Sequence, residues 1–185
     1  MAIGHWRVVP TAHRRWIVIN AVIISALSNL VINSAIAWIS SVGKPHISLW
    51  STPLLGGPNL VTDTLGTFFL LPFTTCLVVT LAVRQSRSRG LLHDLESHER
   101  GPSWLTGLPT TVLRRGVRLG WVTLLACAPV SILILAIGFD GGITRADFVA
   151  YKAVLGLVLG LAVTPVIALA AMGDEFTAAP TGSPA

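Results

Sequence analysis

The sequence has few charged residues and few cysteines for its length. Asp, Glu, Lys and Arg make up 11% of its 185 residues, whereas about a quarter of the residues in an average soluble domain are charged. This scarcity excludes an ordinary soluble domain, and the 52% content of hydrophobic residues indicates contact with lipid. Cys76 and Cys127 both fall in apolar stretches, so they suggest neither a disulfide framework nor a paired redox motif.

Four apolar stretches are long enough to cross the hydrocarbon core of a bilayer, which takes about 20 helical residues. They cover approximately residues 16–42, 60–83, 119–139 and 148–172. A transmembrane β-barrel would need apolar and polar residues to alternate over about ten positions, and these stretches do not alternate. The sequence therefore predicts an all-α polytopic membrane protein, with four transmembrane helices in two hairpins within residues 16–172.

Lys and Arg are unevenly distributed among the segments outside these helices. Three precede residue 16, seven lie in the linker 84–118, and Lys44 alone lies between the first two helices. The positive-inside bias predicts that residues 1–15, the linker and the tail 173–185 are cytoplasmic. The tail is rich in Ala, Pro, Thr, Gly and Ser and is predicted to be disordered. These basic residues therefore indicate a membrane orientation and no nucleic-acid partner.

A cleaved signal peptide is an alternative interpretation of the N-terminal region. Arg14 and Arg15 precede an apolar run that contains Ala-Ile-Ala at 35–37, which resembles a cleavage site. The run extends from Trp16 to Ile39, beyond the roughly 7–15 apolar residues of a signal core. We therefore expect an uncleaved first helix.

The first helix carries polar residues where lipid contact is expected. An unpaired amide in hydrocarbon costs roughly several kcal/mol, so Asn29 and Asn33 are predicted to face other helices or water. Two interpretations stay open: hydrogen bonds that join helices, or a polar pocket or path lined by Ser25, Asn29 and Asn33. On a helical projection Asn20 lies nearly opposite this face. The face spans a wedge of about 140° and contains Ala21, Ser25, Ser28, Asn29, Ile32, Asn33, Ile36 and Ser40.

Small residues recur at every fourth position of the fourth helix. The series after Lys152 is Gly156, Gly160, Thr164 and Ala168. Glycine at this spacing lets two helices approach closely, so Gly156, Gly160 and Thr164 are predicted to form a helix-packing stripe. The spacing leaves open whether the partner helix belongs to this chain or to a second copy.

Asp63 and Lys152 are the charged residues closest to the predicted hydrocarbon region. Because an ionised side chain there needs a partner, we expect them to form a polar intramembrane cluster with Ser25, Asn29 and Asn33. Alternatives remain for both residues. Asp63 could cap the start of its own helix, and Lys152 could instead reach the membrane interface or meet Asp147.

Motifs for catalysis and metal binding are missing from the sequence. There is no Gly-x-Ser-x-Gly turn and no phosphate-binding glycine loop. The segment 91–99 contains His and acidic residues, but His93 and His98 are five positions apart and no HExxH motif is present. We interpret this segment as an amphipathic linker, and we predict neither a metal nor a cofactor.

The segments INSAIAWIS and DTLGTFFLLPFTTC resemble those of short four-span bacterial inner-membrane proteins that have no assigned activity. This resemblance covers the first half of the chain. It implies a multi-pass protein of the bacterial plasma membrane, and it brings no site residue.

Two functions follow as expectations. The small-residue stripe favours a non-enzymatic assembly or accessory subunit that acts through helix contacts, either as a homo-oligomer or with a membrane partner protein. The alternative is a small-solute transporter or channel-like protein that uses the polar Asn and Ser face of the first helix.

Overall fold

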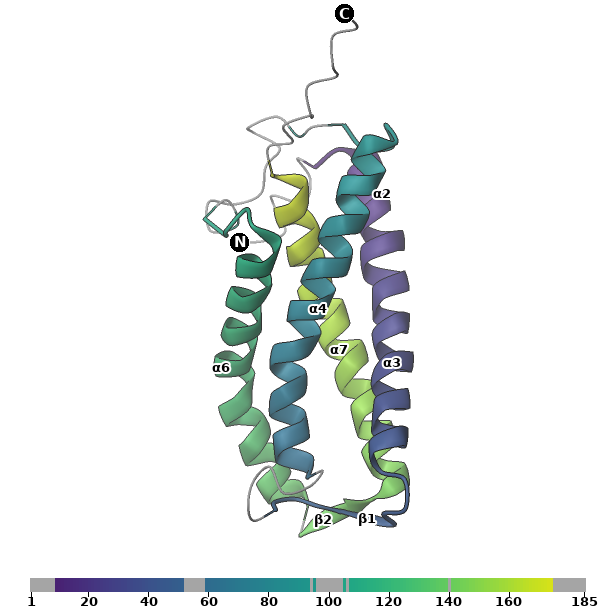
Figure 1. Ribbon diagram of the computed structural model, residues 1–185, viewed down its shortest axis with the longest axis vertical. Helices are drawn as coiled ribbons and strands as arrows, with labels where there is room; N and C mark the ends of the chain where they lie inside the picture. Colours follow the sequence, from purple (N-terminus) through teal and green to yellow (C-terminus); the bar gives the residue numbers. More distant parts are fainter. Residues whose placement is uncertain are drawn as a thin grey trace, which may run out of the picture.

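The computed structural model describes most of the chain and is mostly helical. The described residues are 9–51, 59–93, 95, 105, 107–139 and 141–174. Within them, four helices are long and apolar enough to cross a membrane, namely Thr11–Ser40, Leu60–Ser88, Val112–Gly138 and Arg145–Met172 (Figure 1). This confirms the predicted all-α fold with four such helices. The predictions for residues 1–8, for most of the segment 91–99 and for the tail beyond Asp174 lie outside the described residues.

Three segments join to form the first long helix. They are α2 (Thr11–Trp16), the π-helical segment η1 (Ile17–Ile24) and α3 (Ser25–Ser40). A π-helix uses hydrogen bonds between residues five apart, so it turns less per residue than an α-helix. The side chains of α2 therefore point in directions, relative to those of α3, that a uniform α-helix would not give.

The other three helices extend beyond the apolar stretches seen in the sequence. They are α4 (Leu60–Ser88), α6 (Val112–Gly138) and α7 (Arg145–Met172). Side-chain caps set two of the starts, because Asn59 accepts a hydrogen bond from the Thr62 amide and Thr144 accepts one from the Asp147 amide. Arginine is a good helix former. The helical hydrogen bonds therefore continue beyond the apolar stretches into turns that contain arginine.

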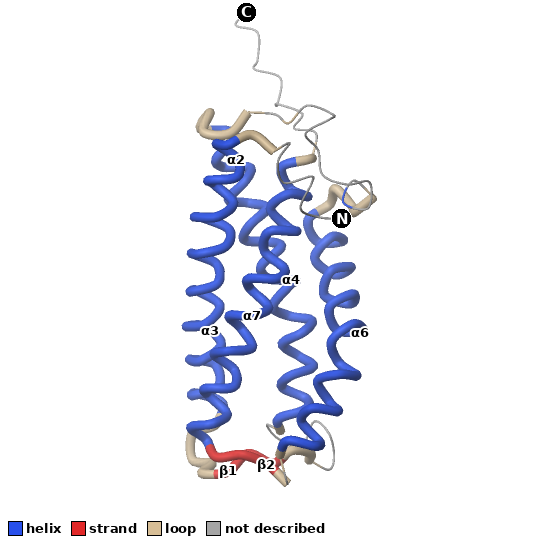
Figure 2. The backbone as a smooth tube through the Cα atoms, turned by 180° about the vertical axis from the view of Figure 1, so that it is seen from behind, coloured by secondary structure: helices blue, strands red, loops and turns tan. Residues whose placement is uncertain are grey.

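Two short strands close one end of the bundle, which we call the strand end (Figure 2). Strand β1 (His46–Ser48) pairs antiparallel with β2 (Gly142–Thr144), and Ile47 lies opposite Ile143. Gly142 has a φ of 151°, and a Cβ atom there would collide with the Ile47 carbonyl oxygen. Only glycine fits this position without strain.

The opposite end, which we call the arginine end, is where α4 ends and α6 begins (Figure 1). Helix α2 begins there and α7 ends there, so all four long helices run between the two ends. The described arginines that gather on α4, α6 and the turn after α4 are Arg84, Arg87, Arg89, Arg114, Arg115 and Arg118.

Helix packing follows an approximate two-fold pattern. Helices α4 and α7 contact each other in the middle, α3 packs against α7, and α6 packs against α4. The first helix of each half of the chain thus packs against the second helix of the other half, and each half has a strand between its two helices. On the α6 side the contact is close, since a Cβ atom at Gly120 would lie 2.9 Å from the backbone oxygen of Phe69.

The apolar core lies along α4 and α7 in three clusters. Near the arginine end it includes Ile17, Val83 and Met172, and near the strand end Ile47, Leu60 and Phe148. The middle cluster is formed by Phe68, Leu71 and Leu159. Among the buried members of these clusters, the first long helix contributes only Ile17 and Ala37.

Candidate functional site

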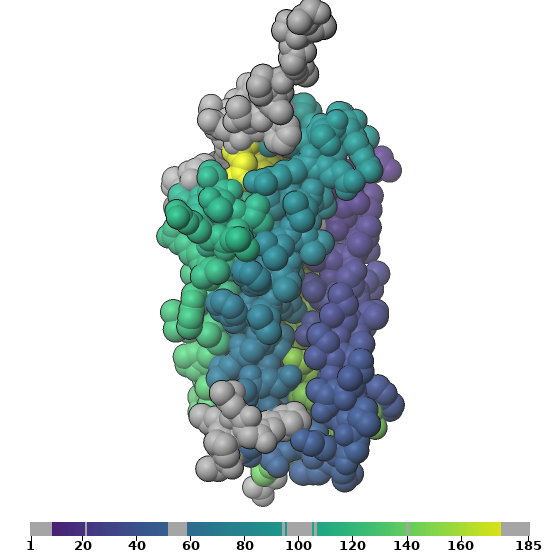
Figure 3. Space-filling view, in the orientation of Figure 1, coloured from purple at the N-terminus to yellow at the C-terminus, as the bar shows by residue number. Residues whose placement is uncertain are grey.

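A groove runs between the first long helix and α4, and we call it the lateral groove. Its volume is about 880 Å³, and Lys152 reaches into it from α7. Figure 3 shows α7 behind the gap between α4 and α3, which is hollowed on this face of the molecule. Ile32 and Ile36 on one wall and Leu70 and Val78 on the other are more than half exposed. The groove is therefore open along its side as well as hollow within.

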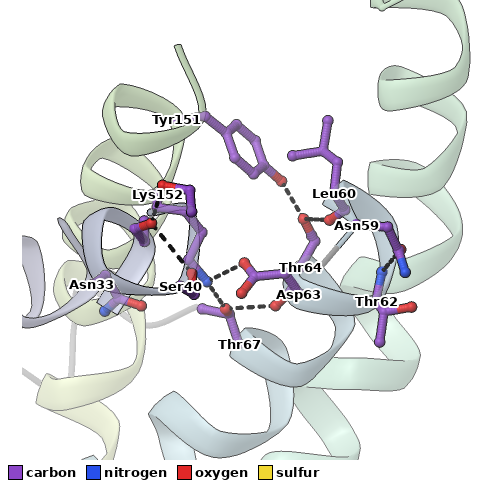
Figure 4. Close-up of polar contacts among 12 residues, drawn as sticks. Asn33, Ser40, Asn59, Leu60, Thr62, Asp63, Thr64, Thr67, Tyr151 and Lys152 are labelled. Atoms are coloured by element: carbon purple, nitrogen blue, oxygen red, sulfur yellow. Dashed lines mark hydrogen bonds and ion pairs between the residues drawn. The ribbon is translucent and has the colours of Figure 1, made fainter. Parts of the chain in front are cut away.

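At the strand end, Lys152 of α7 meets Asp63 of α4 inside the groove (Figure 4). Lys152 is 2% exposed, and its Nζ lies 2.5 Å from Oδ2 of Asp63. The same ammonium donates a hydrogen bond to Oγ1 of Thr67, which in turn donates to the backbone oxygen of Asp63 at 2.8 Å. A buried ammonium is thus held by a carboxylate and a hydroxyl from one turn of α4.

The structure does not support the alternative roles considered for Asp63 and Lys152, namely a helix cap and a contact with Asp147. Asn59, not Asp63, provides the side-chain cap of α4. Asp147 accepts a hydrogen bond from the Thr144 hydroxyl at 2.7 Å, and Lys152 points to Asp63 instead. The pair joins two helices that are far apart in sequence, and breaking such a buried pair leaves an uncompensated charge.

The predicted polar face of the first helix lies between the groove and α7. Asn33 is buried and donates from Nδ2 to the backbone oxygen of Asn29 at 2.8 Å. Asn29 donates to Oγ of Ser25 at 3.5 Å, and Ser25 shares a hydrogen bond of 3.2 Å with Thr164 of α7. These contacts link Ser25, Asn29 and Asn33 within the chain. They do not bring Asn33 into hydrogen-bonding contact with Asp63 or Lys152.

The helix-packing stripe of α7 contacts this same face. A Cβ atom at Gly156 would lie 2.7 Å from Nδ2 of Asn33, and one at Gly160 would lie 2.9 Å from Nδ2 of Asn29. The partner of the stripe is therefore α3 of the same chain. The asparagine amides fill the space that glycine leaves open.

Further polar groups continue along the groove to the arginine end. Asp63 and Arg89 both line the groove and are 26 residues apart on α4 and the turn after it, which at about 1.5 Å per residue is about 39 Å. This exceeds the roughly 30 Å of a bilayer core. The polar side chains that line the groove, which we call the polar ladder, are Asp63, Lys152, Thr67, Asn33, Asn29, Thr74, Thr75, Ser28, Ser25, Asn20, Gln85, Ser86 and Arg89.

Sequence reasoning missed the wall of the groove that α4 contributes, although a periodic signal was present. Thr67, Thr74 and Gln85 are separated by seven and eleven residues, and both intervals return to nearly the same face of an α-helix. Such spacing alone does not distinguish a groove wall from isolated threonines bonded to their own backbone. Thr74, for example, also donates to the Leu70 backbone oxygen at 2.8 Å.

The sequence-based position of Asn20 is wrong. A uniform α-helix places it nearly opposite Asn29 and Asn33, but all three side chains line the lateral groove. The physical reason is η1, which contains Asn20 and turns less per residue than an α-helix. Near this level, Trp16 donates from Nε1 to Oγ of Ser86 at 3.0 Å and ties the first long helix to α4.

A second buried ion pair lies at the arginine end, outside the groove. Arg115 of α6 is 1% exposed and pairs with Asp174, which follows α7. Arg115 also donates from Nε to the Pro109 backbone oxygen at 2.9 Å, and Arg87 of α4 donates to the backbone oxygen of Asp174 at 2.9 Å. Three helices thus meet at Asp174. The sequence placed this residue in a disordered tail, so the pair was not anticipated.

Of the acidic and histidine residues in segment 91–99, the structure describes His93 alone; Asp94, Glu96, His98 and Glu99 lie outside the described residues. The ring of His93 lies 4.6 Å from that of His13, in an edge-to-face arrangement. His13 Nε2 lies 3.0 Å from the His93 backbone oxygen, which joins α2 to the segment after α4.

Comparison of the chain with protein-family models, with curated proteins and with solved structures finds no match to any of the three. The assignment of function therefore depends on the lateral groove and the polar ladder.

Proposed function

We propose that this chain is an integral membrane protein that moves a polar or amphiphilic solute across the bilayer along the lateral groove. The observation that carries this proposal is the polar ladder, which lines a groove longer than the hydrocarbon core is thick. Polar side chains are costly inside a membrane, and where they line a cavity they commonly mark a pathway. A transporter is therefore the function that the geometry supports best.

Two further features favour transport over an assembly or accessory subunit. The stripe of Gly156 and Gly160, whose partner the spacing left open, is occupied by Asn33 and Asn29 of the same chain and so gives no support to contacts with another protein. The groove volume of about 880 Å³ also falls within the range of small-molecule sites, about 300–1,000 Å³. A 20-residue helix about 10 Å across and 30 Å long occupies on the order of 2,400 Å³, so the groove does not enclose one.

The orientation of the protein in the membrane is part of the proposal. The arginines around the ends of α4 and α6 favour a cytoplasmic arginine end, which makes the helices two hairpins whose turns lie outside. The strand end, with the Asp63–Lys152 pair, would then face the outside of a bacterial plasma membrane. Substrate would meet the buried pair at one surface and the exposed Arg89 at the other.

The test is flux through vesicles that contain the purified full-length protein. Vesicles loaded with a panel of labelled polar solutes are diluted, and the loss of each solute is compared with that from protein-free vesicles. In parallel, a fluorescent phospholipid reports movement of an amphiphile between leaflets. We expect at least one of these substrates to move faster than in protein-free vesicles.

A matched pair of variants tests whether the movement uses the groove. Ser28→Trp places an indole on the groove wall, at an exposed position that does not disturb the core. Leu125→Trp places the same side chain on the exposed face of α6, outside the groove. Loss of movement in the first variant alone supports the proposal. If no solute and no lipid moves, or if both variants behave alike, the proposal is overturned.

A further inference from the structure

We infer that the substrate of the groove is a zwitterionic phospholipid, whose headgroup follows the polar ladder while its acyl chains stay in the bilayer. This inference rests on the proposed transport function and names its substrate class. It is carried by three independent properties of the groove, namely its open side, the spacing of its polar groups and the charges at its strand end.

The open side of the groove favours a substrate that has an apolar part. Ile32 and Ile36 on one rim and Leu70 and Val78 on the other are more than half exposed, so lipid tails reach the groove between them. A fully polar solute would meet hydrocarbon along this open side, where its polar groups find no hydrogen-bond partners. A phospholipid avoids this cost, because its acyl chains occupy the open side while its headgroup lies inside.

Polar groups from one wall or the other, and in places from both, continue along the groove. The hydrogen bond between Trp16 and Ser86 sets the relative level of the antiparallel helices. Counting from it, Asn20 lies about level with Ala82, and Ser28 with Thr74. Between Thr75 and Gln85 the side chains by which α4 lines the groove are apolar, and Asn20 and Ser25 of the opposite wall occupy that stretch.

This succession of polar groups suits a phospholipid headgroup better than a small inorganic ion. A headgroup that carries both donors and acceptors can exchange one hydrogen bond before it releases the previous one, which lowers the cost of leaving water. The walls offer amides and hydroxyls, which both donate and accept, in the middle of the membrane. The charged side chains of the ladder stand at its two ends, at Asp63 and Lys152 and at Arg89.

The charges at the strand end match a zwitterion. Lys152 and Asp63 offer one cation and one carboxylate 2.5 Å apart. A headgroup with a phosphate and an amine can replace this pair by two new pairs, phosphate with Lys152 and amine with Asp63, and the total charge stays balanced. Oδ2 of Asp63 is buried against Nζ of Lys152, so a headgroup amine would bind this carboxylate oxygen by replacing the Lys152 ammonium. An anionic lipid would leave Asp63 uncompensated.

The inference is tested by lipid movement in vesicles that also contain a labelled soluble solute. Trace phospholipids with a fluorescent acyl chain are included, either with a phosphatidylethanolamine or with a phosphatidylglycerol headgroup. Dithionite, added outside, bleaches the outer leaflet alone unless lipid moves between leaflets. We expect extended bleaching of the zwitterionic lipid with the wild-type protein, about tenfold slower bleaching with Ser28→Trp, and no change with Leu125→Trp.

A second variant tests the role assigned to Asp63. Asp63→Asn keeps the shape of the side chain but leaves the Lys152 ammonium without its counter-charge. It should therefore raise the rate of movement of the anionic lipid relative to that of the zwitterionic lipid. This ratio is measured on one preparation and does not depend on how much protein is folded. A ratio that does not change contradicts the headgroup assignment.

The outcomes separate this inference from the proposed function. If the soluble solute moves and neither lipid does, the protein transports along the groove, and the phospholipid assignment is wrong. If neither solute nor lipid moves, both proposals are overturned. If both lipids move at equal rates in the wild type and in all variants, the movement does not follow the groove, and the inference is again overturned.

Discussion

A Cβ atom on Gly156 would lie 2.7 Å from the amide nitrogen of Asn33, so α7 and α3 approach each other with no room for a side chain at this position. The same hypothetical atom would lie 2.8 Å from the backbone oxygen of Asn29. Real Cβ atoms do not approach other atoms this closely, so a larger residue must separate the helices. The position of α3, which forms one wall of the lateral groove, thus depends on Gly156 of α7.

The first prediction concerns this contact. Gly156→Ala should destabilise the protein by about 1–3 kcal/mol, because the added methyl group overpacks an interface that includes backbone atoms. The measurement is chemical or thermal unfolding in detergent, followed by tryptophan fluorescence.

Gly66→Ala provides the matched control, since Gly66 is also inside a long helix and its Cβ would meet nothing within 4 Å. Alanine favours the helix over glycine by roughly 1 kcal/mol, so this variant should be at least as stable as the wild type. Equal losses in the two variants would mean that the α3–α7 contact is not close.

The second prediction concerns the pair of Asp63 and Lys152. Asp63→Ala should lower stability by about 3 kcal/mol, because Lys152 is buried and would lose its counter-charge. We take the low end of the usual range because the Asp63 side chain is 21% exposed. The double variant with Lys152→Met should be more stable than Asp63→Ala alone. Strictly additive losses would show that the two charges do not interact.

Asp147→Ala is the control for this cycle. Asp147 forms hydrogen bonds with Thr144 at the start of α7 and does not pair with Lys152. Its removal should cost about 1 kcal/mol, typical of losing interactions at a helix start, and the cost should add to that of Lys152→Met.

The third prediction concerns the arginine end. Asp174→Ala should destabilise the protein by about 3 kcal/mol, because Arg115 is 1% exposed and keeps a buried charge without its carboxylate. Arg115→Lys should not preserve full stability, since the guanidinium also donates from Nε to the Pro109 backbone oxygen. Unfolding midpoints in detergent check both variants.

The neighbouring Arg114 is exposed and serves as the control. Arg114→Ala should change stability by less than about 0.5 kcal/mol, as expected of a surface substitution. A loss as large as that of Asp174→Ala would show that the arginine end is destabilised by any loss of a charged side chain and not specifically by loss of the buried pair.

The fourth prediction concerns orientation. Single cysteines at Ser48 and Thr144, in the two paired strands, should react with a membrane-impermeant thiol reagent added to intact cells. Cysteines at Arg89 and Arg114, at the arginine end, should react only after the membrane is permeabilised. Opposite accessibility of Ser48 and Thr144 would contradict the two-hairpin arrangement.

Part of the candidate site could be predicted from the sequence because it depends on the cost of burying charge. Asp63 and Lys152 stand out as ionisable residues in apolar stretches, and a partner for each was required on energetic grounds. Helix geometry likewise placed Asn29 and Asn33 on one face with Ser25. These inferences need only composition and a regular helical period.

Other parts of the site depend on departures from that regular period or on contacts between distant segments. Asn20 reaches the groove because η1 is π-helical, and hydropathy carries no signal for that change. Arg115 and Asp174 are 59 positions apart, and no local pattern links them. The glycine stripe predicted close packing but could not identify α3 as the partner.

The sequence by itself determined that four long apolar helices form and which side chains could not face lipid unpaired. These follow from the free energy of transferring each group out of water, which is a property of single residues. The tertiary structure decided that α3 packs on α7 and not on α4, and this choice leaves the lateral groove open between the first two long helices. That choice depends on the fit of the asparagine amides of α3 over the glycines of α7, which is a property of two surfaces together and is not encoded in either helix alone.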